Sequence, residues 1–122
     1  MDIFILEDDP QRIAAFVAEF EGHQLVITNS ASQAVKVLKT MTFAFAFLDH
    51  DLGGVYLPSD EKSGRHVSKA MAQDERHKDT QVVVHSWNED AAKRMESDFK
   101  MAGMKVARKM FGTFDKGILY GC

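Results

Sequence analysis

The chain has 122 residues, which is enough for one domain, spanning 1–122, with one hydrophobic core. Its net charge is -3 and it has no long basic run, which argues against an extended nucleic-acid-binding face but leaves room for a small basic pocket. The single cysteine, Cys122, excludes an intramolecular disulfide and fits a reducing compartment. With no signal peptide and no apolar run long enough to span a bilayer, we expect a cytoplasmic protein without a membrane segment.

The first half of the chain predicts short strands that alternate with helices. Apolar runs indicate the strands, and capping residues mark the helix starts. In chain order the elements are a strand at 2–6, a helix capped by Asp9 and begun by Pro10, a strand at 25–28, a helix begun by Ser30 with Gln33, and a strand at 45–48. The apolar stripe of the first helix consists of Ile13, Phe16, Val17 and Phe20.

The second half continues the alternation after a polar, glycine-containing loop. In chain order it has the loop at 52–63, a helix around Val67 and Met71, a strand at 81–85, a helix capped by Asn88 and stopped by Gly103, and a weak strand at 105–107. The tail after Gly112 is too short for us to assign a full helix to it.

This alternation predicts an α/β fold with parallel strands and right-handed crossovers. Five strands at this length fit a flavodoxin-like doubly wound sheet in the order 2-1-3-4-5, with a short or absent last helix. In that order the first, third and fourth strands are neighbours, so the polar residues that follow them meet in one crevice at the carboxyl ends of the strands.

The polar residues after the first strand are acids, Glu7-Asp8-Asp9. Clustered carboxylates suit a hard cation such as Mg²⁺. We interpret Asp9 as a helix cap only, and Glu7 and Asp8 as candidate metal ligands, because burial would otherwise leave them unpaired.

The third strand runs into Asp49-His50-Asp51 and then into two glycines. Asp49 could bind the metal or attack a phosphorus atom, and Asp51 is a further candidate ligand on the same side of an extended strand. His50 could act as a general acid or base, or could be a structural imidazole that holds the turn at 53–54.

His85-Ser86-Trp87-Asn88 follow the fourth strand. Ser86 could hold a phosphate oxygen near the next helix N-terminus, with Asn88 also in reach of a substrate. His85 could complete an acid/base pair with His50. The alternative is structural: Asn88 caps, Trp87 packs and His85 is a satisfied buried histidine.

Two cations are candidates for the phosphate. Arg12, in the first turn of the first helix, could clamp a phosphate or simply pair with one of the acids. Lys109, at the end of the weak fifth strand, could reach the same crevice, with Lys105 and Arg108 as neighbouring alternatives.

Across nearly its whole length the chain resembles a response-regulator receiver domain. The similar segments are 5–10 with its acids, Asp49 at the phospho-acceptor position, Ser86 at the hydroxyl position, and Lys109-Met110-Phe111 at the Lys-Pro-aromatic signature. The resemblance implies that Glu7, Asp8 and Asp49 bind Mg²⁺, that Ser86 touches the phosphoryl group and that Lys109 pairs with it.

The two histidines depart from an ordinary receiver. The segment 48–54, with the sequence LDHDLGG, and the segment 85–88, with HSWN, more closely resemble the cyclic-phosphate processing receiver-like family, whose opening motif Asp8 with Arg12 also fits. That resemblance implies action on a cyclic phosphate of a nucleotide or RNA end.

Two functions follow as hypotheses. In the first, a metal polarises a cyclic phosphate, His50 and His85 share the acid and base roles, and Arg12 stabilises charge during hydrolysis. In the second, the chain is a signalling receiver or phospho-ligand sensor, with Asp49 as phospho-acceptor and a surface that engages a protein partner.

Overall fold

The structure, a computed structural model, describes residues 1–52 and 63–120. One five-stranded parallel sheet has the order β2-β1-β3-β4-β5, as the sequence predicts. The strands are β1 (Asp2–Leu6), β2 (Gln24–Thr28), β3 (Phe45–Leu48), β4 (Gln81–Val84) and β5 (Val106–Arg108). β5 lies one residue later than expected, and β4 ends one residue earlier. Most of the predicted loop at 52–63 lies outside the described residues.

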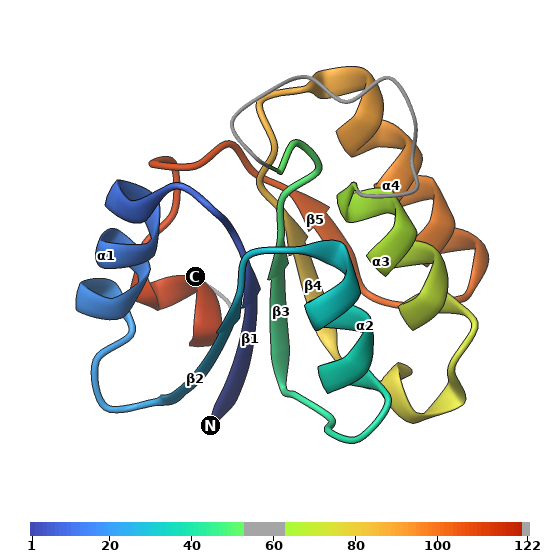
Figure 1. Cartoon of the computed structure of the whole chain (residues 1–122), viewed down its shortest axis with the longest axis horizontal. Coiled ribbons are helices and arrows are strands. Elements are labelled where there is room, and N and C mark those ends of the chain that lie inside the picture. The colour runs from blue at the N-terminus through green and yellow to red at the C-terminus, as the bar shows by residue number, and fades with distance from the viewer. Residues whose placement is uncertain (53–62, 121–122) are drawn as a thin grey trace.

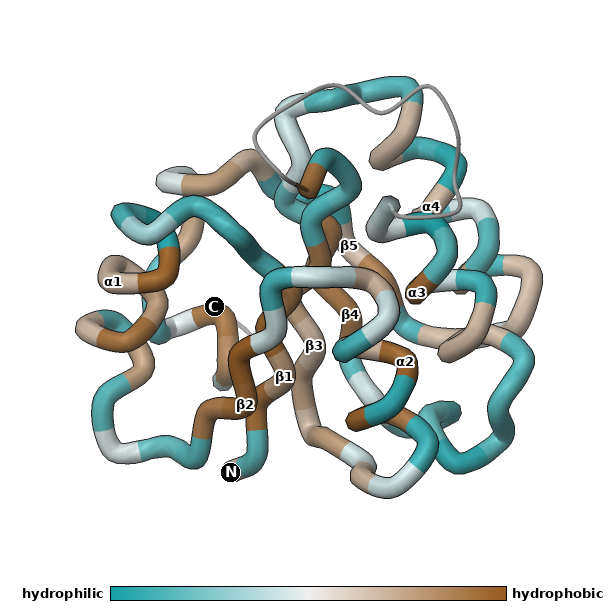
Figure 2. The backbone as a smooth tube through the Cα atoms, viewed as in Figure 1, coloured by the Kyte–Doolittle hydropathy of each residue, from teal (hydrophilic) through white to brown (hydrophobic). Residues whose placement is uncertain are grey.

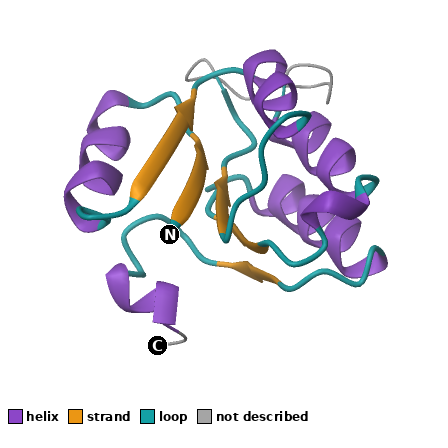
Figure 3. Ribbon diagram, turned by 90° about the horizontal axis from the view of Figure 1, so that it is seen from below, coloured by secondary structure: helices purple, strands orange, loops and turns teal. Residues whose placement is uncertain are grey.

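Helices cover both faces of the sheet (Figure 1). The α-helices are α1 (Pro10–Glu19), α2 (Ala31–Leu38), α3 (Gly64–Ala72) and α4 (Glu89–Met101), and the 3-10 helices are η1 (Glu75–His77) and η2 (Lys116–Tyr120). α1 lies on one face, while α2, α3 and α4 lie on the other (Figure 1). The tail forms only the short η2, which lies on the α1 side and buries Leu119 there (Figure 3). Within the described ranges, no helix is long and apolar enough to cross a membrane.

Side chains alternate between the two faces of the sheet along each strand. Ile3, Ile5, Phe45 and Phe47 pack with α1 and the tail. Phe4, Leu6, Ala46 and Leu48 pack with α2, α3 and α4. Apolar residues therefore line the middle of the molecule on both sides of the sheet (Figure 2). Because side chains alternate between the two faces from one residue to the next, the residue just after a strand points to the face opposite that of the last strand residue. Glu7 and Asp49 follow the α1 face.

The predicted helix starts are confirmed by their side-chain caps. Asp9 accepts hydrogen bonds from the backbone N–H groups of Gln11 and Arg12, at 2.8 and 3.4 Å. Ser30 and Asn88 cap α2 and α4 in the same way. The apolar stripe of α1 is narrower than expected, because Val17 is 48% exposed. The side of α1 that carries Val17 is therefore exposed among the described residues.

Gly64 fixes α3 against the end of β3. Its N–H donates to the carbonyl of His50 at 2.9 Å, and a Cβ atom at this position would lie 1.7 Å from the carbonyl oxygen of Asp49. The overlap is with backbone, so no side-chain rotation can relieve it. The first turn of α3 can therefore reach the candidate site only with glycine here.

We expect Gly64→Ala to lower the free energy of unfolding by roughly 4 kcal/mol or more, since either β3 or α3 must move. Gly103→Ala is the matched control. Gly103 has a φ of +77° and nothing within 4 Å of its Cβ position, so this change should cost only about 1 kcal/mol. Urea unfolding of both variants measures the difference, and equal losses would contradict the close contact.

Candidate functional site

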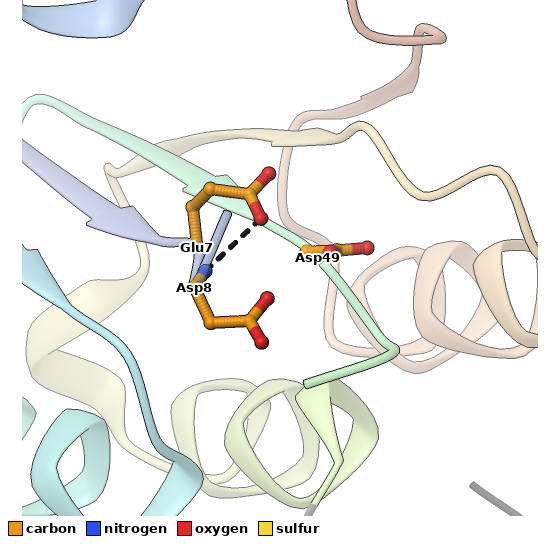
Figure 4. Close-up of side chains that lie close together, drawn as sticks. All are labelled: Glu7, Asp8 and Asp49. Atoms are coloured by element: carbon orange, nitrogen blue, oxygen red, sulfur yellow. Dashed lines mark hydrogen bonds between the residues drawn. The ribbon is translucent and has the colours of Figure 1, made fainter. Parts of the chain in front are cut away.

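Three carboxylates meet at the carboxyl ends of β1 and β3 (Figure 4). Glu7, Asp8 and Asp49 each offer an oxygen atom, and these atoms lie within 4.8 Å of one another. Glu7 and Asp49 are buried, and Asp8 is half-buried. A set of oxygen ligands in this arrangement fits Mg²⁺ or Mn²⁺.

The Glu7 carboxylate is fixed on one side and incompletely satisfied on the other. Its Oε2 accepts hydrogen bonds from the backbone N–H groups of Asp8 and Asp9, at 3.0 and 3.2 Å. Its Oε1 is buried without a hydrogen bond, although Arg12 Nη1 lies 3.6 Å away. Burial raises the pKa of Glu7 despite these favourable contacts. The carboxylate is therefore short of positive charge.

Asp49 is also a buried carboxylate whose charge is incompletely compensated. Its side chain accepts a hydrogen bond from the N–H of His50 at 2.8 Å, yet only 4% of the residue is exposed. Burial, and then the charge of Glu7, raise the pKa of Asp49 to about 7, against the opposing effects of His50 N–H, the Ser86 hydroxyl and Arg12. Two buried acids that repel each other are a donor set that a divalent cation would stabilise.

Arg12 is the cation that the described residues place beside these acids. Its Nη1 lies 3.6 Å from Glu7 Oε1 and 4.0 Å from Asp49 Oδ2. Its guanidinium group also lies over the ring of Phe111, 5.3 Å from the centroid. The sequence leaves a phosphate clamp and an ion pair open for Arg12, and the structure shows the ion pair. Phe111, which supports it from the tail, had no role in our sequence-based site.

His50 and Asp51 form a second pair, separate from the acid cluster. His50 Nδ1 lies 2.6 Å from Asp51 Oδ1, and the Asn88 side-chain amide donates to the same oxygen at 3.3 Å. The chain turns after β3, so the extended geometry that we assumed for 49–51 does not hold. Among the described residues, Asp51 is not part of the group that could hold a metal ion. Its prediction as a ligand is not supported, and its contact is with the histidine.

His85 lies in an apolar environment on the α1 face. It is completely buried, and its ring packs edge-on against Phe16, with centroids 5.4 Å apart. Neither ring nitrogen makes a hydrogen bond, and Nδ1 lies 3.7 Å from Glu7 Oε1. Burial lowers the pKa of His85 to about 3, so the imidazole is neutral near pH 7.

The predicted acid/base pair of His50 and His85 does not form. The two rings lie in different surroundings: His50 turns toward Asp51 after the end of β3, whereas His85 continues the alternation of β4 into the α1 face and packs on Phe16. His85 is buried as the structural alternative expects, but it is not satisfied by hydrogen bonds. Sequence spacing alone could not reveal this, because it depends on where each strand ends.

The remaining predicted residues lie around the cluster. Ser86 contacts Asp49 and accepts a hydrogen bond from the N–H of Asn88 at 3.1 Å. The Asn88 side chain caps α4 and also donates to Asp51, so both of its polar atoms already have structural partners. Lys109 is exposed and lines a cavity of about 50 Å³ together with Ser86. The ion pairs of the described residues join Asp49 to Arg12 and not to Lys109.

Several solved structures with the same fold are receiver domains or sensor proteins. The receiver domain of a sensor histidine kinase from Pseudomonas aeruginosa, with magnesium in its active-site cleft, is 16% identical with a TM-score of 0.70, covering 98% of this chain and 91% of that one. A sensor protein from a Polaromonas species is 25% identical with a TM-score of 0.67, covering 97% and 88%. The Mn²⁺-bound form of a response regulator is 18% identical with a TM-score of 0.68, covering 98% and 87%.

Two sequence comparisons add to the likeness in fold. No curated protein matches it. The family model of the cyclic-phosphate processing receiver domain matches residues 3–101, which run from β1 through α4. This range includes the acid cluster, His50, His85 and Ser86. Since the match covers most of the chain, this protein belongs to the cyclic-phosphate processing receiver domain family.

Proposed function

We propose that this chain binds a cyclic phosphate of a nucleotide or RNA end at the acid cluster and hydrolyses it to a phosphate monoester. The observation that carries the proposal is the pair of buried, undercompensated carboxylates, Glu7 and Asp49, beside Asp8. The family match supports a cyclic phosphate as the ligand.

Glu7, Asp8 and Asp49 would hold a divalent cation, Mg²⁺ or Mn²⁺. Such a cation supplies positive charge that draws a phosphate to the acids and polarises its oxygens. The metals in two of the solved receiver structures support this assignment. The orphaned Oε1 of Glu7 supports it further, because a buried oxygen without a hydrogen bond is costly unless something binds it.

The chain's own donors would hold the phosphate over the cluster. Arg12 lies at the edge of the acids, 25% of its side chain is exposed, and a guanidinium can donate two parallel hydrogen bonds to a phosphate. The Ser86 hydroxyl forms a hydrogen bond with Asp49. Lys109, which shares a cavity with Ser86, is a further cation in reach of the ligand.

His50 is the group that we assign to proton transfer. In hydrolysis, a water oxygen attacks phosphorus and gives up a proton, one ring P–O bond breaks, and the leaving oxygen takes up a proton. Asp51 lies 2.6 Å from His50 Nδ1 and fixes the orientation of the ring, as an acid/base imidazole requires. His85 does not suit the task, because burial holds its pKa far below neutral pH and neither ring nitrogen has a hydrogen-bond partner that would orient the ring.

A second function has one observation in its favour. Asp49 combines the acid cluster with the hydroxyl of Ser86, which is the arrangement that a phospho-accepting receiver uses in the resemblance described above. Asp49 would then carry the phosphoryl group, and the chain would act through a protein partner. Among the described residues Arg12, and not Lys109, is the cation paired with Asp49, so the charges around Asp49 give the receiver function less support than they give hydrolysis.

The first test compares two buried histidines at strand ends. We expect His50→Phe to slow ring opening of adenosine 2′,3′-cyclic phosphate by about 100-fold or more, because it removes the proton-transfer group. His85→Phe should stay within a few-fold of the wild type. Mass spectrometry of products, with Mg²⁺ present, measures both rates. Equal rates in the two variants would contradict the role of His50, and phosphate transfer from a small phosphodonor to Asp49 without any ring opening would favour the receiver function.

The second test concerns the cation. Asp8→Asn should weaken Mn²⁺ binding by about 10-fold or more, because it removes one ligand charge from the cluster. Asp9→Asn is the matched control: it removes a carboxylate one residue away but keeps a good helix cap, so affinity should change little. Titration calorimetry measures both affinities. If the two variants lose affinity equally, general charge rather than coordination explains the binding.

The third test uses the pKa of Asp49 in metal-free protein. Burial raises it from 3.8 to about 7, so between these values the folded chain keeps a proton that the unfolded chain has released. The free energy of unfolding therefore falls as the pH rises through this window. Asp49→Asn resembles the protonated side chain and escapes this loss.

In EDTA, the stability of Asp49→Asn relative to the wild type should therefore increase from about pH 4 to about pH 7 and stay constant above it. Comparing the two proteins at each pH cancels the contributions of the other titrating groups. Urea unfolding measures the difference, and a difference that is the same at every pH would show that Asp49 ionises normally.

A further inference from the structure

Trp87 is a large exposed apolar side chain that lies in the chain between two residues of the candidate site, Ser86 and Asn88. It is the only tryptophan in the chain, and 56% of it is exposed, in contrast to the structural alternative in which Trp87 packs. In the part of the chain that the structure describes, its ring stacks on no other aromatic group. Single exposed apolar residues are common, so the exposure of Trp87 is significant only because of its position between Ser86 and Asn88.

The backbone on both sides of Trp87 is tied to site residues. Before it, Ser86 contacts Asp49 and accepts a hydrogen bond from the N–H of Asn88 at 3.1 Å. After it, Asn88 accepts from the N–H of Ala91 at 3.3 Å and donates to Asp51 at 3.3 Å. The indole is thus presented from a short loop that is held at three points.

This loop places the indole one residue from the phosphate site. Consecutive Cα atoms are about 3.8 Å apart, so the ring starts next to the serine that contacts Asp49. A rigidly held aromatic ring loses little conformational entropy when a ligand covers it. Exposed to solvent, the ring has one face or edge available for such a ligand.

We propose that Trp87 is the stacking platform for the nucleobase of the substrate, which makes the ligand a nucleotide or a single-stranded RNA end rather than a base-free cyclic phosphate. This inference rests on the proposed function, since it specifies the substrate of the same site. An indole stacks on any base through its π-face, so we expect weak preference among bases.

The charge of the molecule favours a short ligand. A long nucleic acid needs a row of cations along its backbone, whereas this chain has a net charge of -3. The described residues offer Arg12 and Lys109 near the cluster, which is enough for one phosphate. A single terminal nucleotide, anchored by its phosphate and its base, matches two cations and one aromatic ring.

The experiment compares a substrate with a base and one without. Adenosine 2′,3′-cyclic phosphate and glycerol 1,2-cyclic phosphate carry the same five-membered ring, and kcat/KM for each is measured with Mg²⁺. Trp87→Ala should lower kcat/KM for the adenosine compound by about 10-fold and leave the glycerol compound unchanged. Trp87→Phe, which keeps a smaller ring, should retain most of the activity. Equal loss for both compounds, or no loss, would overturn the inference.

Because Trp87 is the only tryptophan, its fluorescence reports stacking independently of turnover. The adenosine compound should quench the emission, and the glycerol compound should not. If the wild type opens neither compound, the proposed hydrolysis fails, and quenching by the adenosine compound alone still supports the platform. Absence of quenching at a ligand concentration where calorimetry shows binding overturns it. Emission that changes with protein concentration instead would assign the ring to a protein contact and also overturn the proposal.

Discussion

Burial of two like charges is the constraint on which this site depends. Glu7 and Asp49 end neighbouring parallel strands and point to the same face, so folding brings their carboxylates together whether or not they are neutralised. Arg12 reaches both, at 3.6 and 4.0 Å, but burial still raises the pKa of each acid. The fold therefore keeps a local shortage of positive charge, and a phosphate with its cation is a ligand that supplies it.

Two separate parts of the chain, the cap of α1 and the tail, position the guanidinium group of Arg12. Asp9 caps α1 and so fixes the first turn that carries the arginine. Phe111, from the segment after β5, lies beneath the guanidinium and packs on Phe16 of the same helix. The tail has no full helix, yet it provides the aromatic surface that a cation beside the acids rests on. The short end of the chain is thus part of the site and not only its cover.

The order of the strands and the helix caps could be predicted from sequence because each depends on local chemistry. Apolar runs specify buried strands, and Asp9, Ser30 and Asn88 specify helix starts. The acid cluster followed from topology, since the order 2-1-3-4-5 places the ends of β1 and β3 side by side. These parts of the site needed no knowledge of side-chain packing.

The roles of the histidines could not be predicted because they depend on where each strand stops and which way the chain then turns. A strand that ends at Leu48 lets His50 turn toward Asp51, while pairing continues to His85 and carries its ring into the apolar face. His77 is a further example: its polar neighbours in sequence suggest exposure, but it is buried and its Nε2 lies 2.8 Å from the carbonyl of Leu38. Tertiary contacts decide all three.

The contact of Gly64 with Asp49 has a mechanical consequence. With no side chain between them, the backbone at the end of β3 and the first turn of α3 touch directly, and the N–H of Gly64 is bonded to His50. The end of β3 and the start of α3 are therefore in direct backbone contact. Because α3 in turn packs on α2 and α4, this backbone contact links the position of Asp49 to the helices on the other face of the sheet from α1.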